Sequence, residues 1–259
     1  MKTFEAAGAT ALVTGANQGI GLGFVEALLA RGVRRVYAGA RRSETLDELV
    51  ELDPERVRPL LLDVTDAAHC EQAAAQANDV TLLVNNAGIP GSSEADERRF
   101  LSASSMADAR SVFETDFWAP VRLCRLFAPR IVANGGGAVC NIISIGALFC
   151  LPEYSSYSTA KAALATATAG IRAELDREPV LVSGVFTGGV KTRMSAKNYD
   201  VQTTPLAHAH QVLDAMAAGE EDIFAGENAT DIRDAIHADA KAFERQVVER
   251  FHTAPISID

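Results

Sequence analysis

Short, continuously apolar segments alternate with helical patterns along nearly the whole chain. Strands that are apolar on both faces are typical of a parallel sheet covered by helices on each side. The pattern therefore predicts an α/β fold with a doubly wound, mostly parallel sheet of about seven strands, whose ligands bind at the carboxyl ends of the strands. The strands are expected at Ala11–Thr14, Arg35–Ala40, Pro59–Asp63, Thr81–Asn85, Ala138–Ser144, Val180–Phe186 and Asp222–Phe224.

Helical patterns occupy the intervals between these strands. No linker or repeat divides residues 1–259, so we expect one domain. An irregular stretch from Gly189 to Pro205 precedes an amphipathic run, and we expect the segment at about 189–220 to be a mobile flap over the substrate. Helices are expected at Ile20–Arg31, Ser43–Val50, Asp66–Ala77, Ala107–Val132, Ser155–Arg177, Ala207–Ala218 and Asp231–Phe251.

Composition excludes several classes of partner. A net charge of −10 would repel nucleic acid and anionic membranes, and no apolar run is long enough to span a bilayer. Four cysteines without C-x-x-C spacing are expected to be buried thiols, and the start has no signal-peptide pattern, so a cytoplasmic protein is expected. His208 and His210 form only a weak metal signal; a solvated helix face is favoured, and no metal is predicted.

A glycine-rich loop, TGANQGIG at residues 14–21, lies between the first strand and the first helix. Glycines let the backbone turn sharply and approach a pyrophosphate, which the N–H groups at the start of the helix stabilise. The alternative is a tight turn without a ligand, but the order strand, glycines, helix favours a dinucleotide. The residues of this loop predicted to bind it are Gly15, Asn17, Gln18, Gly19, Ile20 and Gly21.

The end of the second strand indicates which dinucleotide is preferred. An acidic residue there would bind the ribose 2′-hydroxyl of NAD, but the sequence has Ala40 followed by Arg41 and Arg42. A guanidinium binds a 2′-phosphate through two hydrogen bonds, so NADP(H) is predicted to be preferred, with NAD(H) possible. The alternative is that both arginines are solvated at the end of a strand.

Tyr157 and Lys161 are spaced i and i+4 on a predicted helix, so they share one face. A phenol has a pKa near 10, and a neighbouring ammonium is expected to lower it towards the pH at which proton transfer is efficient. Ser144 ends the fifth strand, where its hydroxyl could bind the same carbonyl oxygen. The three residues together predict general acid/base chemistry on a carbonyl or alcohol.

These motifs, with Asn85-Asn86-Ala87-Gly88 after the fourth strand, resemble those of the short-chain dehydrogenases/reductases, over roughly residues 9–195. The resemblance implies a Rossmann fold, a catalytic Ser144, Tyr157 and Lys161, and a homo-oligomer, tetramer or dimer. It implies further cofactor contacts from Asp63, Val64, Asn86, Ala87, Gly88, Tyr157 and Lys161, and from Gly188, Val190 and Thr192 in a segment similar to the family's P-G-x-V-x-T.

Two positions depart from the family pattern. Asp116 aligns with an Asn that holds a water beside the lysine; it is predicted either to take that role, pairing with Lys161, or to be an ordinary helix carboxylate. Thr187 replaces the Pro of the segment after the sixth strand, which leaves the start of that loop less rigid.

The residues expected around the mouth of the site are mostly apolar, and no basic residue besides Lys161 is expected there. The predicted function is an NADPH-dependent carbonyl reductase or secondary alcohol dehydrogenase acting on a mostly apolar small molecule. Alternatives are an NAD-dependent alcohol dehydrogenase working oxidatively, a non-catalytic dinucleotide sensor, and a halide-releasing lyase, which would have Arg in place of Lys161. The expected wall residues are Ile89, Pro90, Ile145 to Phe149, Leu151, Pro152, Met194 and Tyr199.

Overall fold

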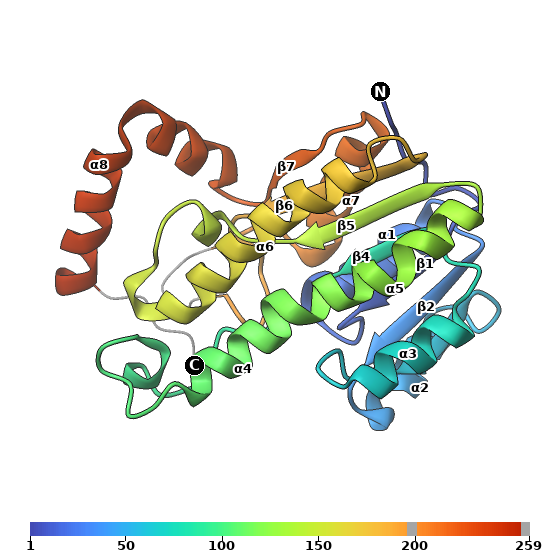
Figure 1. The fold of residues 1–259 in the computed structure, drawn as a ribbon, viewed down its shortest axis with the longest axis horizontal. Helices are drawn as coiled ribbons and strands as arrows, with labels where there is room; N and C mark the ends of the chain where they lie inside the picture. The colour runs from blue at the N-terminus through green and yellow to red at the C-terminus, as the bar shows by residue number, and fades with distance from the viewer. Residues whose placement is uncertain (196–200, 255–259) are drawn as a thin grey trace.

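The computed structural model describes residues 1–195 and 201–254. Its centre is a parallel sheet with the strand order β3-β2-β1-β4-β5-β6-β7 (Figure 1). The strand order reverses between β1 and β4, which is where doubly wound sheets bind ligands. The strands are β1 (Thr10–Thr14), β2 (Arg35–Ala40), β3 (Val57–Leu61), β4 (Leu82–Asn85), β5 (Gly137–Ile142), β6 (Val180–Thr187) and β7 (Asp222–Ala225).

Helices cover both faces of the sheet, as predicted. One face carries α1, α2 and α7, and the other carries α3, α5 and α6, while α8 lies apart from both layers beside β7 (Figure 1). The helices are α1 (Gly19–Ala30), α2 (Leu46–Leu52), α3 (Ala67–Gln76), α4 (Ala107–Phe113), α5 (Ala119–Ala133), α6 (Ser155–Glu174), α7 (Pro205–Ala217) and α8 (Ala229–Thr253).

The strands are apolar throughout because each contributes to two cores. In β1, Ala11 and Val13 pack against α1 and α7, whereas Leu12 packs against the layer that contains α3 and α5. Successive side chains of a strand point to opposite faces, so a strand buried on both sides has no polar alternation. This is the physical origin of the continuous apolar runs in the sequence.

The edge strand β3 begins two residues before its predicted start. It includes Pro59, which lacks an N–H, and the ladder tolerates it because β3 pairs only with β2. Helix α1 is followed by Gly32 in the left-handed region, with φ of 74°, as expected for a residue that ends a helix. The other strand bounds agree with the predictions to within two residues.

The predicted long helix from Ala107 to Val132 is interrupted by a wider turn. Residues Glu114–Trp118, between α4 and α5, form a π-helical turn that contains Asp116. Such single turns are rare and are frequent at functional sites, because the extra residue redirects side chains. The consequence for the site is described below.

Several side chains differ from expectation. His208 is fully buried on α7, which packs against α1, so the predicted solvated face is wrong for this residue. Cys70, Cys124 and Cys140 are buried as expected, whereas Cys150 is exposed because it lies in the loop before α6. No described helix combines the length and the apolar composition that a membrane span requires.

Candidate active site

A cavity of about 1070 Å³ opens at the carboxyl edge of the sheet. Each of the seven strands is followed by residues that line it, because parallel strands all end at the same edge. Of the predicted catalytic and cofactor-binding residues, all but Gly21 line this cavity. Tertiary folding therefore brings together segments that span residues 15 to 192.

The glycine loop is packed so closely that side chains would not fit. Gly15 has φ of 64°, and a Cβ on Gly21 would lie 2.2 Å from the carbonyl oxygen of Gly15. Gly21 thus lies beneath the loop and permits the turn instead of lining the cavity. Gln18, which precedes α1, makes no side-chain cap, so the first N–H groups of the helix are left for a ligand. This arrangement fits the pyrophosphate of a dinucleotide.

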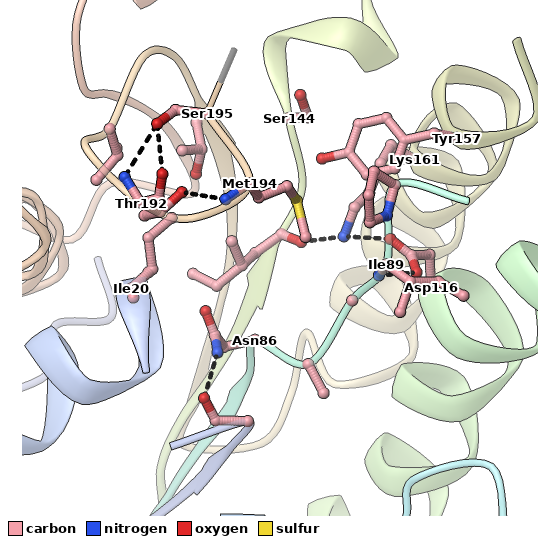
Figure 2. A pocket seen from close by; sticks show the side chains of 18 of the residues that line it. Ile20, Asn86, Ile89, Asp116, Ser144, Tyr157, Lys161, Thr192, Met194 and Ser195 are labelled. Carbon is pink, nitrogen blue, oxygen red and sulfur yellow. Dashed lines mark hydrogen bonds and ion pairs between the residues drawn. The ribbon is translucent and has the colours of Figure 1, made fainter. Parts of the chain in front are cut away.

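Asn86 joins the ends of β1 and β4 beneath this loop. Its Nδ2 donates to the carbonyl oxygens of Thr14 at 2.8 Å and Gly15 at 3.3 Å (Figure 2). The Thr14 hydroxyl accepts in turn from the backbone N–H groups of Asn86 at 2.9 Å and Ala87 at 3.0 Å. These bonds hold the two strands at the point where the sheet order reverses, so Asn86 acts through the backbone geometry of the loop.

Arg41 and Arg42 follow β2 and are both exposed at one end of the cavity, near Asp63. Burial by itself raises the pKa of Asp63, but hydrogen bonds from Thr65 and the positive charge of Arg41 outweigh it and lower that pKa. Asp63 is therefore ionised at neutral pH, and Arg41 is close enough to influence it. This end of the cavity offers guanidinium groups to a phosphate and a carboxylate to a hydrogen-bond donor.

Ser144, Tyr157 and Lys161 converge on the other side of the cavity (Figure 2). Ser144 lies two residues beyond β5, where its hydroxyl accepts from the N–H of Gly146 at 3.1 Å. Lys161 Nζ donates to the carbonyl oxygen of Ile142 at 3.0 Å and lies 5.7 Å from the centre of the Tyr157 ring. The i, i+4 spacing on α6 thus places the ammonium beside the phenol, as predicted.

Asp116 completes this group as a fully buried carboxylate. Its Oδ2 lies 3.2 Å from Lys161 Nζ, and its Oδ1 accepts from the N–H of Ile89 at 2.9 Å (Figure 2). The π-helical turn brings this carboxylate into the site. A Cβ on Gly88 would lie 2.9 Å from Oδ2, so a glycine is needed there. Of the two predictions for Asp116, the geometry favours pairing with Lys161.

The three ionisable groups influence one another. Burial alone would lower the pKa of Lys161, but the charges of Asp116 and Tyr157 outweigh it and raise that pKa, so the ammonium is retained. Burial raises the pKa of Asp116 against the pull of Lys161. The pKa of Tyr157 is raised by burial, and Lys161 and a hydrogen bond with Ser144 oppose this rise without reversing it. The expected net lowering by Lys161 is therefore absent, because burial and Asp116 act in the opposite direction.

The loop after β6 packs against the glycine loop. Thr192 packs against Gly19: a Cβ added to Gly19 would lie 3.4 Å from the methyl group of Thr192. Val190, in the same loop, is buried. Gly188 allows no side chain, because a Cβ would lie 2.2 Å from the carbonyl oxygen of Glu227. The Thr192 hydroxyl accepts from the N–H of Met194 at 3.2 Å, which shapes the loop (Figure 2).

Thr187, which stands where the family has Pro, is held by His208. The Thr187 hydroxyl and His208 Nε2 are 3.3 Å apart, and both residues are buried. Burial lowers the pKa of His208 to about 4, so its ring is neutral at neutral pH. This contact joins the end of β6 to α7, and the sequence contained no local signal for it.

The lining of the cavity contains basic residues that the sequence pattern did not predict. Ile89, Ile145, Phe149, Leu151 and Met194 line the cavity as predicted, while Tyr199 lies outside the described residues. Arg98, Arg193 and Arg250 also line it, so the expectation of no further basic residue is wrong. The reason is that Arg98 and Arg250 come from segments far from the motifs in sequence.

Comparisons with known proteins agree with this geometry. A family model described as short chain dehydrogenase matches residues 9–203. The human L-xylulose reductase is 35% identical over 73% of this chain and 74% of that protein, and the putative oxidoreductase SadH of Mycobacterium tuberculosis is 30% identical over 75% and 71%. The 2-(R)-hydroxypropyl-CoM dehydrogenase of Xanthobacter autotrophicus is 29% identical over 85% and 92%.

Solved structures show the same architecture. A short chain dehydrogenase from Burkholderia cenocepacia in complex with NADP superposes with a TM-score of 0.85 at 35% identity, covering 94% of this chain and 98% of that one. The L-sorbose reductase of Gluconobacter frateurii, complexed with NADPH and L-sorbose, has a TM-score of 0.74 at 22% identity, covering 84% and 94%, and supports the fold alone.

Proposed function

The chain belongs to the short-chain dehydrogenase/reductase family and is an NAD(P)-dependent oxidoreductase; from this premise we propose that it is an NADPH-dependent carbonyl reductase. The observation that carries the proposal is the group of Ser144, Tyr157 and Lys161 on one wall of a cavity whose opposite end presents Arg41 and Arg42. The same site can oxidise a secondary alcohol in the reverse direction.

In this mechanism a bound nicotinamide supplies the hydride that reaches the carbonyl carbon. Tyr157 donates its phenolic proton to the carbonyl oxygen, so the ketone becomes an alcohol and the phenol becomes a phenolate. Ser144 orients the same oxygen through its hydroxyl, and Lys161 stabilises the phenolate that forms. Lys161 is also expected to bind the ribose next to the nicotinamide. The phenolate regains a proton from solvent after each turnover.

Asp116 is proposed to hold Lys161 in position for this work. The ammonium is fixed between the Asp116 carboxylate and the carbonyl oxygen of Ile142, so its direction towards Tyr157 is set before substrate binds. A buried ion pair of this kind retains the lysine charge that a lone buried ammonium would lose. Asp116 thus replaces the family's Asn as a positioning residue.

The preference for NADPH rests on two observations. Arg41 and Arg42 occupy the end of β2, where NAD-dependent enzymes place a carboxylate. The similar short chain dehydrogenase from Burkholderia cenocepacia binds NADP. The remaining predicted contacts except Gly21 line the same cavity: they come from the glycine loop, Asp63, Val64, residues 86–88 and the loop from Gly188 to Thr192.

Reduction is favoured over the NAD-dependent oxidative alternative. The residues after β2 are Arg41 and Arg42 and not a carboxylate, which supports NADPH, the cofactor of reductions, over NAD. Ser144, Tyr157 and Lys161 all line the cavity. This argues against a non-catalytic protein that only senses the dinucleotide, because such a sensor needs none of these three groups.

Substrate access and assembly are also proposed. Helix α7, which belongs to the predicted flap, packs against α1, and Met194 in the same predicted flap lines the cavity. A homo-oligomer, dimer or tetramer, is proposed through the outer faces of the long helices α5 and α6, next to which Trp118 is 52% exposed. Buried free thiols suit the proposed cytoplasmic location.

The decisive experiment measures NADPH oxidation with a panel of ketones for wild type and Tyr157→Phe. Loss of the phenolic proton is expected to lower kcat by roughly 10²- to 10⁴-fold while NADPH still binds. Tyr37→Phe is the matched control, since that tyrosine bonds Asp79 outside the cavity. Undiminished turnover in Tyr157→Phe would overturn the mechanism.

A further inference from the structure

Arg98 is a buried cation on the wall of the cavity. It ends a short turn, Asp96–Arg98, and is 4% exposed, yet it lines the cavity. Removing a guanidinium from water is costly unless its surroundings compensate the charge and satisfy its donors. The partners of this side chain therefore indicate what it is built to bind.

The protein holds Arg98 through neutral groups. Its Nε donates to the carbonyl oxygen of Glu153 at 3.2 Å, and its Nη1 donates to those of Ser92 at 2.9 Å and Ser93 at 3.4 Å. The guanidinium also lies 4.3 Å from the centre of the Tyr154 ring. These contacts use Nε and Nη1 and fix the plane of the guanidinium.

The charge of Arg98 and one of its amino groups remain available. Within residues 1–195 and 201–254, Arg98 has no carboxylate partner and its Nη2 has no hydrogen-bond partner. The neighbouring carboxylate of Glu153 pairs with Arg250 instead, at 3.5 Å. A guanidinium that is rigid and charged, with two N–H groups to offer, is suited to an anionic oxygen group.

Arg98 is joined to the segment that leads to the proposed proton donor. The guanidinium lies over the ring of Tyr154, three residues before Tyr157, and the hydroxyl of Ser156 donates to the carbonyl oxygen of Arg98 at 3.3 Å. Arg98 and Tyr157 line the same cavity, so a ligand in that cavity has access to both groups.

The surroundings of Arg98 suit a short apolar chain with a charged end. Phe149 and Leu151 line the same cavity, and Arg193 adds a guanidinium to the lining, whereas Arg250 is paired with Glu153. The chain as a whole has a net charge of −10, so Arg98 and Arg193 are local positive charges in an acidic protein. Such local charges attract the anionic end of a small molecule.

We propose that Arg98 is a specificity residue that binds the carboxylate of a keto acid substrate through Nη2, while the keto oxygen lies at Tyr157 and Ser144. This inference rests on the proposed carbonyl reductase function and names its substrate class. It replaces the expectation of an uncharged apolar substrate with one that has an apolar middle and an anionic end.

The test compares keto acids with their methyl esters. NADPH oxidation is measured with 4-oxopentanoate, 5-oxohexanoate and 6-oxoheptanoate and with the three esters. Wild type is expected to have a kcat/KM roughly tenfold or more higher for the acid at one chain length, as for a charge-assisted hydrogen bond. Arg98→Gln is expected to remove that preference and to leave the esters within about threefold of wild type.

Two results would overturn the proposal: an ester preference in wild type, or an equal loss for acid and ester in Arg98→Gln, which is what a purely structural role predicts. Because Arg98 also holds the 92–93 loop, Arg98→Lys is made in parallel. It keeps the charge, and is expected to retain part of the acid preference even where Arg98→Gln folds poorly.

A binding measurement separates this inference from the proposed function. Calorimetry of 4-oxopentanoate with the NADP⁺-saturated protein is expected to show weaker binding in Arg98→Gln and unchanged binding in Tyr37→Phe, whose hydroxyl bonds Asp79 outside the cavity. Arg98-dependent binding without turnover of any ketone would refute the reductase and support the subsite. Ketone reduction without an acid preference would do the reverse.

Discussion

The two ends of the cavity are built in different ways. The cofactor end consists mainly of closely packed backbone. A Cβ added to Gly21, for example, would lie 2.2 Å from the carbonyl oxygen of Gly15. The substrate end consists of side chains such as Arg98 and Phe149, contributed by segments far apart in the sequence. Helix α8, with non-helical backbone at Asp239, packs against β7 and against the short turns Ile145–Ala147 and Pro152–Tyr154 at that end.

This difference predicts different responses to substitution. A site made of closely packed backbone allows no side chain to be added, so changes there act on folding and on cofactor binding together. A site made of side chains can be altered one residue at a time, so changes there act on substrate selection and leave the cofactor bound. The family can therefore keep one nucleotide site while its members use different substrates.

The largest effect is expected for Gly21→Ala at the cofactor end. The new methyl group would force Gly15 to move, which should lower the free energy of unfolding by about 1–3 kcal/mol. Because the loop is then misplaced, NADPH affinity should fall by roughly 100-fold. Gly170→Ala on α6 is the matched control, because nothing lies within 4 Å of its Cβ position. Denaturant unfolding and NADPH titration measure both quantities, and equal behaviour of the two variants would contradict the steric account.

A smaller and more selective effect is expected for Arg41→Asp. Removing a guanidinium and adding a carboxylate at the end of β2 should weaken NADPH binding by roughly 10- to 100-fold, because charge-assisted bonds to a phosphate are lost. NADH binding should change little. Fluorescence titrations with both cofactors give the ratio, and an equal loss for NADH and NADPH would remove Arg41 from cofactor selection.

At the substrate end, Phe243→Ala should raise KM by roughly 2- to 10-fold. The Phe243 ring on α8 packs edge-on against Phe149 with centroids 5.0 Å apart, and such pairs contribute about 0.5–1.5 kcal/mol. NADPH affinity should not change, which is the contrast with Gly21→Ala. Val248→Ala, 47% exposed on the same helix, serves as the control. A parallel loss of NADPH affinity would show that the two ends are not independent.

The smallest effect is expected for Asp116→Asn, which keeps a side-chain oxygen for the N–H of Ile89 but removes the charge. The negative charge of Asp116 raises the pKa of Tyr157, so its removal should lower that pKa. Oxidation of an alcohol requires the phenolate, so the rising limb of its pH–rate profile should move to lower pH. Asp108→Asn, outside the cavity lining, is the control, and an identical profile for Asp116→Asn would exclude this coupling.

The parts of the site that depend on local spacing can be predicted from the sequence. The glycine loop follows from a strand and a helix adjacent in the chain, and Tyr157 and Lys161 share a face because residues four apart on a helix do. Strand identity followed from the apolar runs that burial on both faces requires. Each of these features is determined within about ten residues.

Other features required knowledge of which segments pack together. The ion pair of Asp116 with Lys161 joins residues 45 positions apart, and it depends on a π-helical turn inside a run that reads as a continuous helix. The neutral, buried His208 depends on the packing of α7 against α1.

The amino-acid sequence by itself therefore determined the fold, the nucleotide cradle and the paired Tyr157 and Lys161, because periodicity and turn chemistry are local properties of the chain. Only the tertiary structure decided the direction of the Tyr157 pKa shift and the presence of Arg98 beside the site. Burial and charge are set by every neighbour in space, and most of those neighbours are distant in sequence.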